Sequence, residues 1–376
     1  MSDANSKENF EENFDRIYKE ASPNFDEHVN IAFVGKVSTG KSSLLNAILG
    51  RTREDPIAAV GAKSGVTTKV NAYKLDEQVL ICDCPGLNDI RKENGEETNR
   101  FLNSIDLGIF VVTGSSDSAQ KSNFDDLRNA SKKAIVVINK IDEWDDLEES
   151  AYKVVVDQWK KYLDVDQIFG TCTKGFDPQF KKGAAMDLRG VAEVRDEIFI
   201  FLRRHKKDIL LARHLRNKNE YAIKLIAAAL VAVAGEAFIP GSAAYITATQ
   251  LAAITSLHYV YKGKALDKSA ALALLPSFVG ESLGTNIFLW AKSFLPPTGV
   301  VDIAAAFVAV TITFAMLAAV KWMLENQYEL DKKDSLKGAF NEFKEKFKKN
   351  LKDIDITDLK NPKFVFDFLL RILNSK

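Results

Sequence analysis

Residues 35–42 read GKVSTGKS, and this stretch decides the fold of the first half of the chain. An apolar, β-rich run at 29–34 precedes it, and a helical pattern at 43–49 follows it and stops at Gly50. Glycines in the stretch permit backbone conformations that turn successive N–H groups inward, and the helix N-terminus adds a positive dipole. The stretch therefore predicts a strand, a phosphate-binding loop and a helix.

This loop predicts nucleotide contacts by residue type. Lys41 would reach the β- and γ-phosphates, and the hydroxyl of Ser42 would hold Mg²⁺. The expected phosphate-binding residues are Gly35, Ser38, Thr39, Gly40, Lys41, Ser42 and Ser43.

Two further segments are expected to complete the phosphate and metal site. The irregular segment 51–68 ends in two threonines, and we expect the hydroxyl of Thr68, with Thr67 as the alternative, to bind Mg²⁺ and sense the γ-phosphate. Asp83 leaves an apolar strand and would contact Mg²⁺ through water, while Gly86 would bring a backbone N–H to the γ-phosphate. These segments predict the metal residues Ser42, Thr68 and Asp83.

The base-specific signal follows a strand. Residues 107–113 and 134–139 are near-continuous apolar runs, as in parallel strands that are buried on both faces. The second run leads into Asn139, Lys140 and Asp142. The Asp142 carboxylate can accept from the guanine N1–H and N2–H₂ together, the Lys140 stem can lie along the purine, and Asn139 can tie this loop to the phosphate loop. The pattern favours GTP over ATP.

A third strand, at 167–170, leads into Thr171, Cys172 and Thr173. Backbone N–H groups there would touch the guanine O6. The alternative is an ordinary junction between a strand and a loop.

In this order the motifs resemble GTPases of the translation-factor class, and within it the Era-like and TrmE-like GTPases, over residues 28–203. The resemblance implies an α/β P-loop GTPase domain with a doubly wound, mostly parallel sheet. It also implies a GDP/GTP switch with Mg²⁺-dependent hydrolysis, in which Lys41, Thr68 and Gly86 serve catalysis.

Two positions depart from the family pattern. Ser38 stands where potassium-using TrmE-like members carry Asn, which argues against potassium activation. Leu87 stands where Ras-type enzymes place a water-orienting Gln. We therefore expect slow hydrolysis unless another group positions the water, and a homodimer across the nucleotide face is one source of that group.

Charge divides the chain unevenly. Residues 1–202 carry 26 Lys+Arg against 35 Asp+Glu, and residues 203–376 carry 25 against 16. The imbalance indicates a boundary near residue 200. It suits the second half either to an anionic surface, such as lipid or nucleic acid, or to charge complementarity between two packed domains.

Other features indicate a reduced, cytoplasmic protein. Cys82, Cys84 and Cys172 form no paired framework, and the first thirty residues lack the pattern of a signal peptide. Residues 1–27 instead predict an amphipathic helix.

The second half predicts an all-α domain. Four apolar, alanine-rich blocks occupy residues 222–240, 243–261, 269–290 and 300–323. The fourth contains the uncharged run 303–320, long enough to span a membrane, although a buried helical bundle explains the blocks equally well. We expect an alanine-rich domain at 204–330, with possible association at the cytoplasmic face of a membrane.

Residues 331–376 predict amphipathic helices. The helix expected at 335–351 is basic and would bind either a membrane surface or the bundle. A last helix would begin at Asn361-Pro362. The second half resembles the helical domain of some uncharacterised bacterial Era-like GTPases, through its alanine-rich block and its turns at 239–241 and 295–299. The overall layout is similar to immunity-related and dynamin-like GTPases.

The sequence thus predicts a GTP-hydrolysing switch that controls a helical domain acting on a membrane, a protein effector or a second copy. The alternatives are an Era-like ribosome- or RNA-associated GTPase and a GTP-binding module with little turnover. Nucleic acid is the less favoured partner, because the second half has positive charge but no Gly-x-x-Gly clamp.

Overall fold

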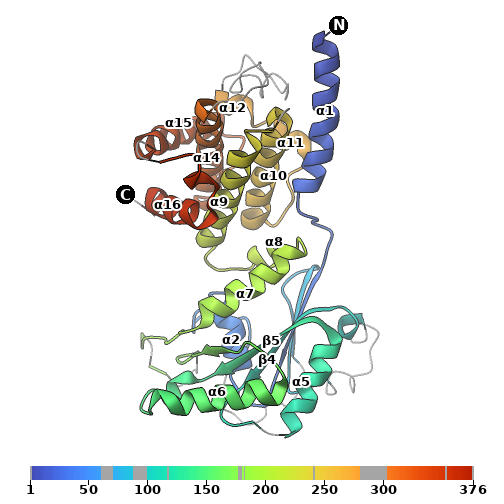
Figure 1. Ribbon diagram of the computed structural model, residues 1–376, viewed down its shortest axis with the longest axis vertical. Coiled ribbons are helices and arrows are strands. Elements are labelled where there is room, and N and C mark those ends of the chain that lie inside the picture. Colours follow the sequence, from blue (N-terminus) through green and yellow to red (C-terminus); the bar gives the residue numbers. More distant parts are fainter. Residues whose placement is uncertain are drawn as a thin grey trace. The chain divides into compact units, whose positions relative to one another are not determined.

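The computed structural model describes residues 2–60, 71–87, 100–116, 118–176, 180–181, 183–239, 242–279, 303–351 and 354–374. The chain forms two compact units (Figure 1). We call residues 26–216 the α/β unit, and residues 1–25 together with 217–376 the helical unit.

This division differs from the expected domains at both ends of the α/β unit. Residues 1–25 fold with the C-terminal helices instead of forming a separate segment, because α1 (Ser2–Ala21) packs its apolar face on α10 (Ser242–Lys262) (Figure 1). The second boundary lies after Arg216 rather than after Arg203. The reason is that α8 (Asp208–Ala212) is buried and packs on α7 (Val191–Arg204).

The α/β unit contains a six-stranded sheet in the order β2-β3-β1-β4-β5-β6. β2 pairs with β3 in an antiparallel sense, and all other neighbours are parallel. The expected doubly wound, mostly parallel α/β sheet is therefore confirmed. The strands are β1 (Val29–Val34), β2 (Asn71–Lys74), β3 (Val79–Cys84), β4 (Ile105–Val112), β5 (Ser131–Asn139) and β6 (Phe169–Thr171).

Helices cover the sheet because its strands are apolar on both faces. One face packs on α5 (Ser118–Ala130) and α6 (Glu149–Leu163), with Trp159 fully buried among the strand residues. α2 (Lys41–Ile48) packs on β1 and α7, where the Arg195 guanidinium donates to the carbonyl oxygens of Ala47 and Ile48, both at 2.8 Å. Arg195 thereby supplies hydrogen bonds to carbonyl groups at the C-terminal end of α2, the helix that begins at the phosphate loop.

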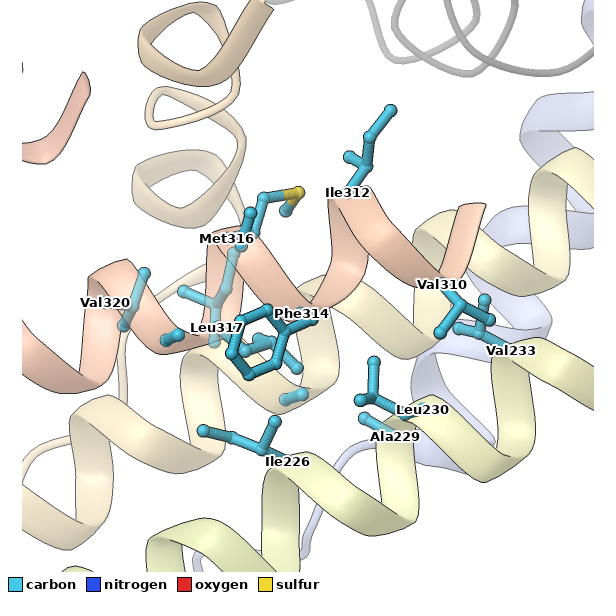
Figure 2. Packing of buried hydrophobic residues seen from close by; sticks show 14 of the residues in the cluster. Ile226, Ala229, Leu230, Val233, Val310, Ile312, Phe314, Met316, Leu317 and Val320 are labelled. Atoms are coloured by element: carbon cyan, nitrogen blue, oxygen red, sulfur yellow. The ribbon is translucent and has the colours of Figure 1, made fainter. Parts of the chain in front are cut away.

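The helical unit is built around α14 (Ile303–Glu325), which contacts three other helices. Figure 2 shows side chains of α14, among them Val310 and Phe314, turned toward Leu230 and Val233 of α9. The other elements among the described residues of this unit are α9 (Asn219–Glu236), α11 (Lys268–Leu272), α12 (Pro276–Val279), α15 (Lys333–Asn350), η3 (Asp358–Lys360) and α16 (Pro362–Asn374).

The packing of α14 bears on whether this helix lies in a membrane or in a helical bundle, which its composition does not decide. By length and composition it is long and apolar enough to cross a membrane, but 78% of its most apolar stretch is buried inside the unit. Its polar groups also find partners within the unit: the Gln250 side-chain amide donates to the Thr313 hydroxyl at 2.8 Å, and Lys321 pairs with Glu325 at 2.7 Å. This packing favours the bundle over the bilayer.

The C-terminal helices also pack on the bundle. α15 buries Phe340 and Phe347, and the Phe347 ring stacks on Phe314 with a centroid distance of 4.4 Å. α16 begins at Pro362 as expected, and the side chain of Asn361 accepts from the N–H groups of Lys363 and Phe364. The apolar face of the basic helix is therefore used for docking on the bundle. The expected turn at 295–299 and the end of the third block lie outside the described residues.

The charge imbalance between the two halves disappears when the chain is divided by units. The helical unit carries 22 Lys+Arg against 21 Asp+Glu, and the α/β unit carries 29 against 30. The acidic residues 1–25 belong to the helical unit, and the basic residues 203–216 belong to the α/β unit. Net charge therefore gives neither unit a preference for an anionic surface.

Candidate nucleotide site

The phosphate loop joins β1 to α2, and its backbone is specified at Gly40. Gly40 has φ +86°, in the left-handed region that a side chain rarely adopts. A Cβ atom there would lie 2.2 Å from Nδ2 of Asn139. Glycine is therefore required both by the backbone conformation and by the close approach of Asn139.

Lys41 directs its ammonium group into this loop. The side chain is buried, and Nζ donates to the carbonyl oxygens of Gly35 at 2.8 Å and Lys36 at 3.0 Å. Burial lowers the pKa of Lys41, while the Asp83 carboxylate opposes that shift. A cation is thus held among loop carbonyl groups at the start of a helix.

Asp83 and Ser42 form a pair of oxygen ligands beside this lysine. The Ser42 hydroxyl donates to Oδ2 of Asp83 at 2.5 Å, and Oδ1 lies 3.7 Å from Lys41 Nζ. Asp83 is fully buried, and Oδ1 has no hydrogen-bond partner among the described residues. Burial raises the pKa of Asp83, against the effect of Lys41 and Ser42. A hydroxyl and a buried carboxylate with an unsatisfied oxygen fit a hard divalent cation such as Mg²⁺.

The segment after β3 is braced by α5. A Cβ atom on Gly86 would lie 2.8 Å from Oδ1 of Asn123, whose Nδ2 lies 3.5 Å from the Pro85 carbonyl oxygen. Leu87, which replaces the water-orienting Gln of Ras-type enzymes, is fully buried in the core with Phe124. Its position is therefore explained by packing.

Asn139 lies at the centre of the base end of the site. It is buried at the end of β5, and its side-chain amide donates to the Thr39 carbonyl oxygen at 2.9 Å. Oδ1 accepts from the hydroxyls of Thr171 at 3.0 Å and Thr173 at 3.3 Å. The expected link between this loop and the phosphate loop is present, and it extends to the end of β6.

The Asp142 carboxylate is held by residues that follow β6. Its Oδ1 accepts from the Cys172 thiol at 3.3 Å, and its Oδ2 lies 3.2 Å from Lys174 Nζ. Burial raises the pKa of Cys172 to about 12. Lys140 has φ +64°, and its side chain is 40% exposed, so its stem is open to solvent. The carboxylate is thus oriented before any base arrives.

The structure brings together most of the residues expected at the site, from four parts of the chain. Ser38 is exposed with φ +68°, the Thr39 hydroxyl donates to the Lys36 carbonyl oxygen at 2.9 Å, and Ser43 is buried in α2. Thr68 and its alternative Thr67 lie outside the described residues. The sequence did not reveal the bracing role of Asn123, or that of Arg53, which donates to the backbone carbonyl oxygens of Gly175, Lys181 and Ala184. Neither residue belongs to a motif.

Comparison with known proteins agrees with this geometry. Residues 30–140 match the family described as 50S ribosome-binding GTPase. The α/β unit therefore has the fold of a P-loop GTPase domain. The GTPase domain is similar to GTPase Era of Clostridioides difficile, with 32% identity over 129 residues that cover 32% of this chain and 42% of that protein.

Another relative and a solved structure are also similar to parts of the chain. The tRNA modification GTPase MnmE of Desulforamulus reducens is 27% identical over 224 residues, which cover 57% of this chain and 47% of that protein. The chain thus spans less than half of the length of these two relatives. A crystal structure of Aquifex aeolicus Era bound to GDP·AlF4⁻ aligns with a TM-score of 0.32 and 18% identity, over 55% of this chain and 68% of that one.

Proposed function

We propose that this protein is a GTP-binding and GTP-hydrolysing switch whose nucleotide state controls its helical unit. The observation that carries the proposal is the group formed by Lys41, Ser42 and Asp83, in which one fully buried carboxylate oxygen faces Lys41 at 3.7 Å and accepts no hydrogen bond from the described residues. A buried, unsatisfied carboxylate oxygen is costly, and a bound cation would remove that cost. The GTPase domain supports the choice of nucleotide.

We propose that Ser42 and Asp83 hold Mg²⁺, with Thr68 as a third contributor. When bound, Mg²⁺ would neutralise charge on the β- and γ-phosphates. Lys41 would exchange the carbonyl oxygens of Gly35 and Lys36 for phosphate oxygens. Gly86 would donate its backbone N–H to the γ-phosphate.

We assign guanine recognition to the groups around Asn139. Asp142 would accept from N1–H and N2–H₂, and Lys140 would cover one face of the base. The backbone of Thr171, Cys172 and Thr173 would meet O6. Two contacts on the Asp142 carboxylate support this assignment, because they fix it in one orientation.

Hydrolysis by the isolated chain is expected to be slow. Leu87 is buried and carries no group that orients water. We propose that a second copy across the nucleotide face, or a protein partner, supplies the missing group. Turnover per molecule should then rise with protein concentration or on addition of that partner.

We propose that residues 213–216 carry the nucleotide state to the helical unit, which begins at the next residue. Arg216 contacts the segment that follows α2, through its N–H to the Leu49 carbonyl oxygen at 3.0 Å and through its guanidinium to the Thr52 hydroxyl at 2.7 Å. His214 and Arg213 both contact Asp76 in the turn between β2 and β3. Movement of either γ-phosphate-sensing segment would therefore reach this junction.

The packing of α14 supports a partner that is a protein or a second copy of this chain, rather than lipid. Three buried cysteines, all free thiols, support a cytoplasmic location. The description of the matched family supports a ribosome-associated role as a second candidate. The near-zero net charge of both units does not favour that candidate, since it supplies no general attraction to RNA.

The test is binding and turnover by the purified full chain. Fluorescent GDP should bind with an affinity that EDTA weakens, and phosphate release should require Mg²⁺. Lys41→Ala should weaken binding by about 100-fold or more, because a buried cation that faces the phosphates is lost. Lys36→Ala is the matched control, because the Lys36 side chain is exposed and its backbone carbonyl remains. Residual nanomolar affinity in Lys41→Ala would contradict the site.

A further inference from the structure

Arg53 binds the loop that follows β6 at three described positions. It lies in the segment after α2, and its guanidinium donates to three backbone carbonyl oxygens. Nε donates to Gly175, Nη1 donates to Lys181 at 2.8 Å and Nη2 donates to Ala184 at 3.1 Å. Its carbon Cζ also lies 5.7 Å from the centre of the Phe180 ring. A planar fork of donors suits this arrangement, and a lysine cannot reproduce it.

The loop that Arg53 holds is continuous with the base end of the site. Gly175 directly follows Lys174, which pairs with Asp142. Lys174 also pairs with Asp187 through a backbone bridge, and the N–H of Cys172 donates to the Arg189 carbonyl oxygen at 2.9 Å. The loop is therefore closed at its base by residues 172–174 and 187–189. Arg53 holds the described part of the loop beyond that closure.

Arg53 and its three acceptors belong to two different segments of the proposed nucleotide site. Arg53 lies in the irregular segment 51–68, whose last threonine is expected to sense the γ-phosphate, whereas its three acceptors follow the residues expected to meet guanine O6. One side chain therefore connects the segment after α2 to the loop after β6.

We infer that Arg53 is a positioning residue for guanine recognition, which fixes the 172–174 backbone at the distance required by O6. This inference rests on the proposed nucleotide site. Arg53 is assigned no contact with phosphate or base, and it acts through the loop backbone. Loss of the Arg53 side chain should weaken the binding of GDP and of GTP by the same factor, because both nucleotides contain guanine.

The experiment compares GDP with 6-thio-GDP, which differs only by sulfur at position 6 and is a poorer hydrogen-bond acceptor. Affinities for the full-length wild type and for Arg53→Ala are measured by competition against fluorescent GDP. We expect the wild type to prefer GDP by about tenfold, the value of roughly one hydrogen bond. Arg53→Ala should reduce that preference to about two- to threefold and raise the GDP dissociation rate about three- to fivefold.

Arg51→Ala is the matched control. Arg51 lies in the same segment but pairs with Asp55 and donates to the His214 carbonyl oxygen at 3.1 Å. It should keep the wild-type preference. Arg53→Lys, which retains charge without the fork, should give an intermediate preference and preserves the test if Arg53→Ala does not fold.

The outcomes separate the inference from the proposed function. Equal weakening of GDP and 6-thio-GDP by Arg53→Ala would indicate a general structural role and would overturn the inference. A wild type that binds both nucleotides equally would also overturn it, while leaving GDP binding intact. A wild type that binds no GDP would instead refute the proposed function.

Discussion

The side-chain amide of Asn139 donates to the Thr39 carbonyl oxygen across 2.9 Å, which joins the base end of the site to the phosphate loop. The same side chain accepts from Thr171 and Thr173 at the end of β6. One buried residue therefore holds three loops that are distant in the sequence. Its structural contribution is present without nucleotide.

We expect Asn139→Ala to lower the free energy of unfolding by about 2–4 kcal/mol, since buried partners lose hydrogen bonds. Chemical denaturation of the nucleotide-free protein measures this effect. Asn129→Ala, on the exposed surface of α5, is the control and should change stability by less than about 0.5 kcal/mol. A loss for Asn139→Ala as small as that of the control would show that the three loops are held by other contacts.

Gly40 and Gly235 should respond to alanine in opposite directions. Gly40→Ala forces a Cβ atom to within 2.2 Å of Asn139 and into a strained backbone conformation, so we expect a loss of about 2 kcal/mol or more. Gly235 lies in α9 with open space around its Cα, so Gly235→Ala should stabilise the protein by about 0.5–1 kcal/mol. Thermal unfolding of both variants tests the pair, and a stable Gly40→Ala protein would contradict the described loop.

The raised pKa of Cys172 predicts that the folded protein loses stability at alkaline pH. Its pKa is about 12 in the folded protein and roughly 8.5 in an unfolded chain, so the folded state holds the thiol proton more tightly. The stabilisation is fully present below pH 8.5 and is lost as the pH rises toward 12. Wild type should therefore lose up to about 1.4 kcal/mol per pH unit more than Cys172→Ala above pH 8.5. Parallel slopes for the two proteins between pH 8.5 and 10.5 would refute this.

We expect substitutions of Gln250 and Thr313, a buried polar pair in the helical unit, to have coupled effects on stability. The Gln250 side-chain amide donates to the Thr313 hydroxyl at 2.8 Å, and both residues are fully buried. Gln250→Leu and Thr313→Val should each cost about 1–3 kcal/mol, because each leaves a buried polar group without this partner. The double variant should cost less than the sum of the two, by about 1 kcal/mol. Strict additivity would indicate that the pair contributes no mutual stabilisation.

The sequence by itself determined which functional groups the loops of the α/β unit offer. The phosphate loop, Asp83 and the run from Asn139 to Asp142 each lie at or directly after the carboxyl end of an apolar strand, and parallel strands place these ends at one edge of a sheet. The convergence of these residues at one edge of a mostly parallel sheet could therefore be predicted from local patterns, whereas the order of the strands came from the structure. The start of α16 at Asn361-Pro362 was equally readable, because its capping signal is local.

Only the tertiary structure decided how the chain divides and what covers α14. The apolar stripe of α1 does not reveal its partner, and its packing on α10 moves the N-terminal acids into the helical unit. The apolar residues of α14 would suit lipid or protein equally, since both solvents are apolar. Arg53 and Asn123 reach their backbone partners across long sequence separations, which no local pattern encodes. Local patterns determine which groups a segment offers, whereas long-range packing determines which of those groups meet.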